Sequence, residues 1–351
     1  MYRVHMRALH AHVLYAHVQQ NLCVICMGER RKSMEKIRME EKSREPKQHG
    51  RLYYRLKENI EISLLALPGL ILLLLFEYWP LYGVIIAFKD YNPRLGIIGS
   101  PSVGLENFKF FFHSQDAGRI MRNTLSYSVC WLVLGIVCSV TLAVLFYNIR
   151  SAKALKVYNT IVILPKFMSS VLIAYIVYAL LCPSYGIVNQ IIEAFGGEAI
   201  QWYNEAKYWP VILTITRIWS HVGMDSIIYY ASLVGLDSAL LEAAELDGAT
   251  SFQKAWHVMV PHLTPTIVVM LILGIGGLFS GDFGLFYQVT KDQGVLYPTT
   301  DIINTYTYRA LIDGSVEKSA AVGLFQSVAG FILVVGSNLI VRKISPEDSL
   351  F

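Results

Sequence analysis

Charged and aromatic side chains recur at a spacing of four residues within one long apolar segment. Arg217, His221 and Asp225 share a helical face at this spacing, Tyr229 follows one turn later, and Asp282 lies in another apolar segment. Charged groups at membrane depth usually face a cavity or a partner, and sugars are held by such groups and by aromatic rings. We therefore predict that His221, Asp225, Tyr229 and Asp282 line a path for a polar substrate. The alternative is that Arg217 and Asp225 serve helix packing.

The chain contains none of the short motifs that mark an active site. HExxH and GxSxG are absent, and His113 and His262 are isolated. The GxxxxGK[ST] loop that cradles phosphates is also absent, so we expect no ATP binding in this chain by that route. Histidines near the Cys23-Val-Ile-Cys26 pair suggest zinc, but the second half-site is missing. We predict a protein that is not an enzyme and that holds no cofactor or metal.

Composition indicates a membrane protein. The 351 residues are 54% hydrophobic and only 16% charged, with a mean hydropathy of +0.44. Soluble domains carry about 25% charged residues. The net charge of +4 is too modest to indicate a nucleic-acid partner, and the five cysteines suggest no disulfide framework.

Six apolar segments have the ~20 residues that cross ~30 Å of hydrocarbon. They cover residues 64–88, 125–147, 157–181, 209–234, 267–285 and 320–341. Several contain prolines, which are tolerated when neighbouring helices cover the freed carbonyls. The predicted fold class is therefore an all-α integral membrane protein with six transmembrane helices packed as a bundle.

Lysine and arginine mark one side of the membrane. They are concentrated in the N-terminal tail, in the loop 148–156 and after the last span. The rule that basic loops stay inside makes this side cytoplasmic, with both termini on it. The loop 89–123 is also basic, but the tail outweighs it. We expect a multi-pass protein of the cell membrane.

A polar island separates spans four and five at residues 235–266. Asp237 can cap a first short helix, and Gly248 suits the left-handed residue that ends it. A second helix can start near Thr250 or Ser251. Its apolar residues at 252, 255, 256 and 259 follow the i, i+3, i+4, i+7 pattern, and Pro261 should end it. The island is therefore predicted to be a helix-turn-helix parallel to the membrane.

The acidic residues of the island disfavour a connector that lies on lipid. Glu242, Glu245 and Asp247 would face anionic headgroups in that arrangement. Small alanines permit close approach, so a protein surface suits the island better.

The spacing of the island resembles a known signature. Glu242-Ala243-Ala244, Gly248 and Val258-x-Val260-Pro261 resemble the EAA motif of permease subunits of binding-protein-dependent ABC importers, with Val-x-Val-Pro in place of the usual Ile-x-Leu-Pro. The segments 67–93, 103–112, 226–233, 299–311 and 341–351 are similar to the oligosaccharide or polysaccharide branch of the sugar importers. The resemblance covers about residues 60–351.

The resemblance implies a type I ABC importer permease fold and a set of partners. Glu242, Ala243, Ala244, Asp247, Gly248 and Pro261 would belong to the coupling region that sits in a cleft of a cytoplasmic ATPase subunit, which binds the ATP. A second permease, expected to be a different chain, would complete the path. An extracytoplasmic solute-binding protein would deliver the carbohydrate. The rival function is a stand-alone secondary transporter of a polar solute, but no convincing internal repeat supports it.

The expected domain organisation has four parts. Residues 1–61 would form a disordered, basic cytoplasmic tail, whose first 33 residues could precede the true start codon. Residues 62–120 would hold the first span and an extracytoplasmic loop. Residues 121–343 would form the permease core with five helices and the EAA loop 237–265, and residues 344–351 a cytoplasmic C-terminus. The sequence does not identify the saccharide.

Overall fold

The computed structural model describes residues 60–344. The expectations for almost all of the basic tail and for residues 345–351 lie outside this range. The chain divides into two compact units, Met1–Pro80 and Leu81–Phe351, which are described separately. Residues 60–344 are helical, with a single isolated β-bridge between Lys89 and Ser102 and no strand among them.

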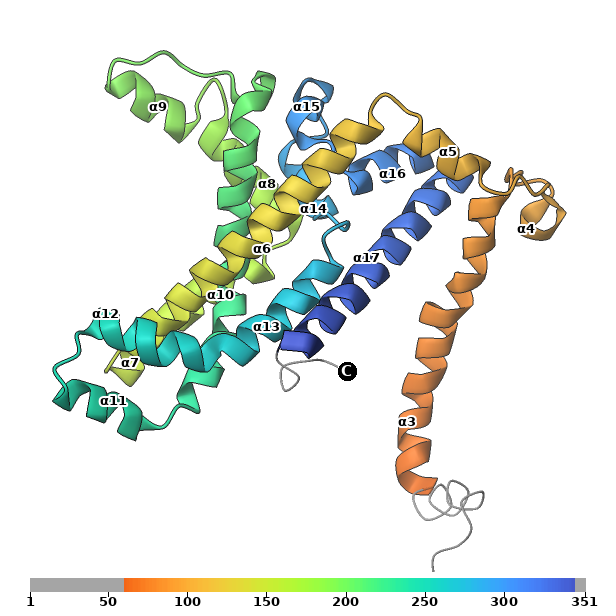
Figure 1. Cartoon of the computed structure of the whole chain (residues 1–351). Helices are drawn as coiled ribbons and strands as arrows, with labels where there is room; N and C mark the ends of the chain where they lie inside the picture. Colours follow the sequence, from red (N-terminus) through yellow and green to blue (C-terminus); the bar gives the residue numbers. More distant parts are fainter. Residues whose placement is uncertain (1–59, 345–351) are drawn as a thin grey trace, which may run out of the picture. The chain divides into compact units, whose positions relative to one another are not determined.

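Figure 1 labels the main helices in chain order. The elements, with η for 3-10 and π turns, are α3 (Ile60–Leu73), η1 (Leu74–Tyr78), η2 (Trp79–Phe88), α4 (Gly96–Gly99), α5 (Glu106–Phe112), α6 (Ala117–Tyr147), α7 (Ala152–Ile163), η3 (Leu164–Phe167), α8 (Ser170–Leu181), α9 (Ile187–Ala194), η4 (Trp202–Asn204), η5 (Ala206–Tyr208), α10 (Trp209–Val234), α11 (Ser238–Leu246), α12 (Ser251–Lys254), η6 (Ala255–Met259), α13 (Val260–Gly276), α14 (Phe283–Val289), η7 (Gly294–Leu296), α15 (Tyr297–Thr300), α16 (Ile303–Ile312) and α17 (Val316–Ile344).

Four helical stretches among the described residues are long and apolar enough to cross a membrane. They are Leu64–Phe88, Ala117–Tyr147, Ser251–Gly276 and Val316–Lys343. Two bent pairs bring the total to as many as six: Ala152–Phe167 with Ser170–Leu181, and Ala206–Val234 with Ser238–Leu246. The predicted all-α membrane class is confirmed, and the predicted span 64–88 has the bounds that the structure gives.

The third predicted span is not one continuous helix. The chain bends by 101° between Phe167 and Ser170. Pro165 lies in the 3-10 turn before the bend, and Met168 is extended, with ψ 139°. Ser169 then caps α8, because its hydroxyl oxygen accepts a hydrogen bond from the Leu172 N–H at 3.3 Å. Hydropathy alone predicted a straight span over 157–181 because it does not register a cap within an apolar run.

The fifth predicted span, 267–285, is displaced toward the N-terminus. One unbroken helix runs from Ser251 to Gly276 and includes the second helix of the polar island. Pro261 was predicted to end that helix, and this was wrong. Pro261 lies in the first turn of α13, directly after the π turn η6, in which the Val260 N–H bonds to the Ala255 carbonyl. A proline is tolerated in the first turn of a helix because its missing N–H is not needed there.

The helix ends at Gly276, and the chain continues irregularly to Asp282. Residues 277–282 are called the break below. The Asp282 carboxylate accepts a hydrogen bond from the Leu285 N–H at 3.0 Å and so caps α14. The Gln326 amide of α17 donates to the Phe279 carbonyl at 2.7 Å. The break therefore has hydrogen-bond partners for its exposed backbone.

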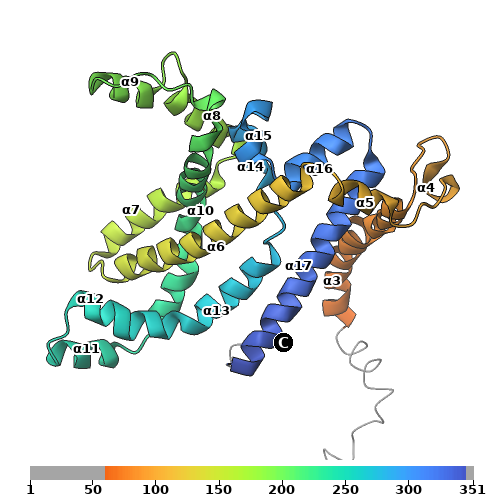
Figure 2. The ribbon, with the colours of Figure 1, turned by 45° about the horizontal axis from the view of Figure 1, so that its top comes forward.

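The second unit packs around α6 and α10, which make its most extensive helix–helix contact. One buried cluster lies where α8, α10 and α14 meet and includes Trp209 and Phe286. A second cluster includes Tyr229 and Met259 and lies near the polar island. Figures 1 and 2 show α11 and α12 at one end of α10, and α9, α14 and α15 toward the other.

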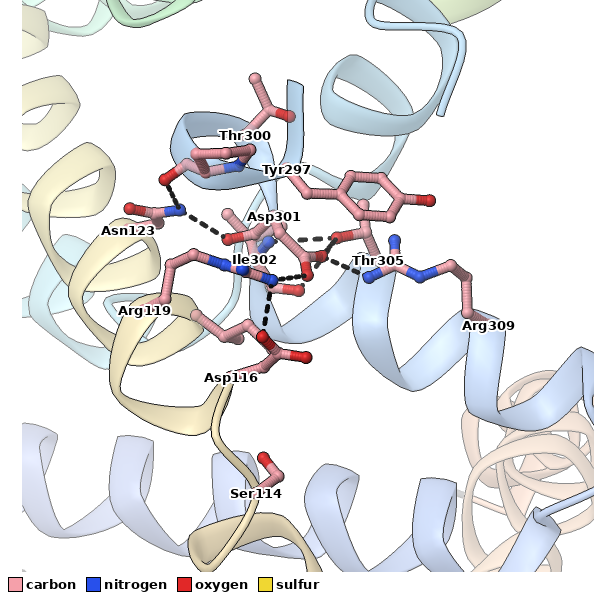
Figure 3. Close-up of polar contacts among 12 residues, drawn as sticks. Ser114, Asp116, Arg119, Asn123, Tyr297, Thr300, Asp301, Ile302, Thr305 and Arg309 are labelled. Atoms are coloured by element: carbon pink, nitrogen blue, oxygen red, sulfur yellow. Dashed lines mark hydrogen bonds and ion pairs between the residues drawn. The ribbon is translucent and has the colours of Figure 1, made fainter. Parts of the chain in front are cut away.

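A buried polar network joins the start of α6 to the α15–α16 junction (Figure 3). The Asp301 carboxylate is only 2% exposed and receives Arg309 at 2.6 Å, Arg119 at 3.5 Å and the Thr305 hydroxyl at 2.9 Å. The Asn123 amide donates to the Asp301 carbonyl at 3.1 Å. Burial lowers the pKa of Arg309, but the hydrogen bond and charge of Asp301, together with Tyr297 and Asp292, outweigh this and leave the pKa raised. Arg309 therefore stays charged.

Substitution of Asp301 by Asn should destabilise the protein strongly. Removal of one partner from a buried ion pair costs about 3–5 kcal/mol, and we expect the lower end of this range because Arg309 keeps Asp292 and Arg119 keeps Asp116. We expect Asp301→Asn to lower the melting temperature in detergent, whereas the exposed Asp313→Asn should leave it unchanged. Equal melting of the two variants would show that the network carries no stability.

Helices α10 and α7 pack closely at Gly223, so a larger residue there should destabilise the protein. A Cβ on Gly223 would overlap the backbone carbonyl of Val162, whereas a Cβ on Gly118 would meet nothing within 4 Å. We expect Gly223→Ala to destabilise the protein by about 1–3 kcal/mol through overpacking. Gly118→Ala should cause no loss. Melting curves of both variants check this, and an unchanged Gly223→Ala curve would contradict the close packing.

Candidate functional site

A cavity of about 470 Å³ lies among α6, α10, α13 and the break. We call it the central cavity. Its polar and aromatic wall includes Trp131, Arg217, Asp225, Tyr229 and Asp282. Glycines from α6, α13 and the break complete the wall at 135, 274, 277 and 281. The room for the cavity therefore comes from small residues, and its charges come mainly from α10.

The structure brings three of the four predicted path residues to the central cavity. Asp225, Tyr229 and Asp282 line it, although Tyr229 is only 1% exposed. His221 does not line it. Its Nδ1 lies 2.8 Å from the Ser220 hydroxyl, and its ring borders a smaller cavity beside η3. The four-residue spacing placed His221 on the α10 face correctly, but the side chain turns toward η3, which packs against α10.

Arg217 is the cavity residue that the sequence prediction left out of the path. Its Nε lies 4.0 Å from Asp282 Oδ2, and its guanidinium carbon lies 5.7 Å from the centroid of the Trp131 ring. The ion pair therefore connects the middle of α10 to the break. The spacing of 217, 221 and 225 contained the signal for Arg217, whereas Trp131 stands in an apolar run that marks no site.

Two buried polar atoms among the cavity residues lack a protein partner within the described range. They are Arg217 Nη1 and the Ser139 hydroxyl oxygen. Buried polar atoms in native proteins nearly always have a hydrogen-bond partner, so each such atom calls for an explanation. Both atoms are covered by protein, so a ligand or water in the central cavity reaches them only if the neighbouring side chains move.

The smaller cavity, of about 230 Å³, extends the charged region toward η3. His221, Lys166 and Asp282 line it. Asp282 therefore borders both cavities and also caps α14. A change in the position of Asp282 would affect both cavities together.

The polar island folds as the predicted helix-turn-helix at its start. The Asp237 carboxylate caps α11 by accepting from the Ala239 N–H at 3.0 Å. Gly248 has φ +79°, the left-handed conformation that glycine adopts without strain. Thr250 and Gln253 form a capping box at the start of α12. These three predictions are confirmed.

The surface of the helix-turn-helix is partly different from the prediction. Phe252 and Trp256 are 77% and 62% exposed. Met259, which belongs to the same predicted apolar face, is buried. Leu246 is 90% exposed. The π turn η6 changes the helical register between Trp256 and Met259, so these apolar residues do not lie on one face of the helix. Three large apolar side chains, Leu246, Phe252 and Trp256, are therefore exposed on the helix-turn-helix.

Glu245 is engaged by another residue of the helix-turn-helix. It forms an ion pair with Lys254, whose hydrogen bond holds the pKa of the Glu245 carboxyl below its usual value. This pair joins α11 to α12. Glu242 and Asp247 remain as exposed acids beside the apolar groups.

A charged cavity between apolar helices, with a polar helix pair at one end, is typical of a membrane transport component. Residues 119–346 match the family model described as "Binding-protein-dependent transport system inner membrane component". The match covers well over half of the chain, and the chain belongs to this family.

Relatives and solved structures agree with the family. The chain is 35% identical to protein LplB of Bacillus subtilis over 293 residues, which cover 83% of this chain and 92% of LplB. It is also 35% identical to the polygalacturonan/rhamnogalacturonan transport system permease protein YteP of Bacillus subtilis, over 85% of this chain and 92% of YteP.

The structural comparison confirms the type I ABC importer permease fold. A chain in the crystal structure of a bacterial ABC transporter involved in the import of the acidic polysaccharide alginate superposes with a TM-score of 0.76 at 31% identity, over 84% of this chain and 99% of that chain. A second structure of a bacterial alginate ABC transporter, in complex with a periplasmic protein bound to an alginate pentasaccharide, gives a TM-score of 0.75 at 31% identity, over 84% of this chain and 98% of that chain.

Proposed function

We propose that this chain is the permease subunit that forms half of the import path for an oligosaccharide, driven by a separate ATPase subunit. The central cavity carries the proposal, because it places Arg217, Asp225, Tyr229 and Asp282 around one space inside apolar helices. Hydroxyl groups of a saccharide can accept hydrogen bonds from the Arg217 guanidinium and donate to the Asp225 carboxylate. The names of YteP and of the alginate transporter support a saccharide substrate.

The helix-turn-helix is proposed as the coupling element. The exposed residues Leu246, Phe252 and Trp256 offer an apolar surface, and Glu242 and Asp247 add two carboxylates. The partner of matching chemistry is an ATPase subunit with an apolar cleft and a basic rim. Ala243 and Ala244 permit close approach, and Gly248 sets the turn.

The unbroken helix Ser251–Gly276 connects this surface to the cavity. Its 26 residues span about 39 Å at 1.5 Å per residue. Met270, Leu273 and Gly274 of the same helix line the central cavity. A displacement of α12 by the ATPase would therefore move a wall of the cavity as a rigid lever. Pro261 lies within this lever, in the first turn of α13 directly after the π turn.

The remaining partners and the orientation complete the proposal. One chain supplies half of the path, so a second permease, a different chain, would face this one across it. A solute-binding protein would dock at the end of the molecule that holds α9, α14 and α15. The helix-turn-helix and both termini would be cytoplasmic, as the basic residues of the tail indicate. Residues 121–343 would then form the permease core.

Uptake should depend on the charges of the central cavity. Hydrogen bonds to charged groups contribute about 1.5–3 kcal/mol, which corresponds to roughly 10- to 100-fold in binding. We expect Asp225→Asn to reduce uptake of labelled saccharide by the assembled importer in proteoliposomes by about that factor, and Tyr229→Phe, which removes only the hydroxyl of this buried side chain, to reduce it less. Thr216→Val, on the same helix but outside the cavity, is the control. Unchanged uptake with normal ATPase activity would remove Asp225 and Tyr229 from the path.

Docking of the ATPase should depend on the helix-turn-helix. Glu242→Lys reverses an exposed charge, and Gly248→Val places a β-branched side chain at φ +79°. We expect both to abolish copurification of the ATPase subunit and saccharide uptake, while the melting temperature of the permease falls little. Glu198→Lys reverses an exposed charge near α9 and is the matched control for copurification. Undiminished copurification with Glu242→Lys and Gly248→Val would contradict the assignment.

A further inference from the structure

A separate cavity of about 260 Å³ lies between α8 and the end of α14. We call it the outer cavity. Its wall consists of Tyr175, Tyr287, Gln288, Lys291 and Asp292, together with the small apolar residues Val171 and Ala174. None of these residues lines the central cavity or the smaller cavity beside η3. The outer cavity is therefore separate from both of these cavities.

Lys291 is held in an unusual position at its edge. Its ammonium lies 3.1 Å from the centroid of the Tyr178 ring and 5.5 Å from that of Tyr203. Lys291 and Asp292 have φ values of +55° and +49°, a left-handed conformation that residues other than glycine rarely adopt. Such strained positions persist where the surrounding structure holds them, and they cluster at binding sites.

The charges of the outer cavity favour an anion. Among the described residues, Lys291 forms no ion pair, and its side chain is exposed. Asp292 Oδ1 is already engaged by Arg309 at 3.2 Å and by the Tyr297 hydroxyl at 3.1 Å. The cavity wall therefore holds one ammonium that forms no ion pair within the described range and one carboxylate that already pairs with Arg309.

The tyrosines provide the apolar part of the same site. The Tyr175 side chain is 67% exposed. Tyr287 is held by Phe283, stacked at 5.1 Å between centroids, and by Tyr308 at 5.0 Å. Flat aromatic rings pack against the C–H faces of sugars, and the Gln288 amide can both donate and accept hydrogen bonds.

We propose that the outer cavity binds a saccharide unit that carries a carboxylate. The carboxylate would pair with Lys291, the C–H face of the ring would lie against Tyr175 or Tyr287, and a hydroxyl would bond to Gln288. This inference rests on the proposed function, because it treats the ligand as the imported substrate. The outer cavity adjoins α14, which lies away from α11 and α12 in Figures 1 and 2, so it would receive substrate on the side where a binding protein docks.

Saturation-transfer NMR on the full chain in nanodiscs of zwitterionic lipid tests the site. The probes are trigalacturonate and its carboxyl-reduced, neutral counterpart. We expect trigalacturonate to bind more tightly than the neutral sugar, and Lys291→Gln to weaken its binding about tenfold without affecting the neutral sugar. Lys291→Arg should retain the preference, and Tyr175→Ala should weaken both sugars. Lys207→Gln is the matched control, because Lys207 is also exposed and also lies over a tyrosine ring, that of Tyr208.

The outcomes separate this inference from the proposed function. Equal binding of trigalacturonate to the parent and to Lys291→Gln, with both proteins folded by melting analysis, would overturn the acidic subsite. A parent protein that binds both sugars equally would do the same. If the assembled parent importer takes up no saccharide in proteoliposomes, the proposed function fails, whatever Lys291 does.

Discussion

The hydrocarbon of a bilayer offers no hydrogen bonds to a polypeptide backbone, and every functional feature of this chain depends on that constraint. Irregular backbone is tolerated at membrane depth only where protein groups satisfy it. The break meets this condition through the Gln326 amide and the Asp282 cap, and the bend before α8 meets it through Ser169. Departures from helix are therefore confined to places with polar partners, and the cavities lie beside these places.

The break connects the two ends of the proposed mechanism. Asp282 at its end pairs with Arg217, caps α14 and borders two cavities. The helix that precedes the break reaches back to the helix-turn-helix without interruption. In the proposed mechanism, a movement that begins at α12 would therefore reach Asp282, which pairs with Arg217 at the central cavity. On the far side, α14 leads to the outer cavity and to the network around Asp301.

Sequence reasoning was reliable where a signal is local. The bounds of the span 209–234 are those of α10, and the caps at Asp237 and Thr250 and the turn at Gly248 were all predicted. These features depend on the types of a few neighbouring residues. The pairing of Glu245 with Lys254 was not predicted, because it depends on how α11 and α12 lie against each other.

The failures arise where geometry depends on distant or subtle partners. The π turn before Pro261 allows the helix to continue, and nothing in the local pattern distinguishes it from an ending. The turn of His221 toward η3 depends on packing of a different helix. The ion pairs of Asp301 with Arg119 and of Asp282 with Arg217 join residues far apart in the chain, so no periodicity reveals them.

The central claim is that the unbroken helix transmits movement of the helix-turn-helix to the central cavity. The most direct measurement is the thiol reactivity of a cysteine at the cavity residue Ser280, in the assembled importer without nucleotide and trapped with ATP and vanadate. A second protein carries glycines at His257 and Val258, within the π turn, to make the lever flexible. The account predicts that trapping changes the reactivity several-fold in the parent and not in the glycine variant, while the ATPase still copurifies with both. A change of equal size in both proteins would contradict it.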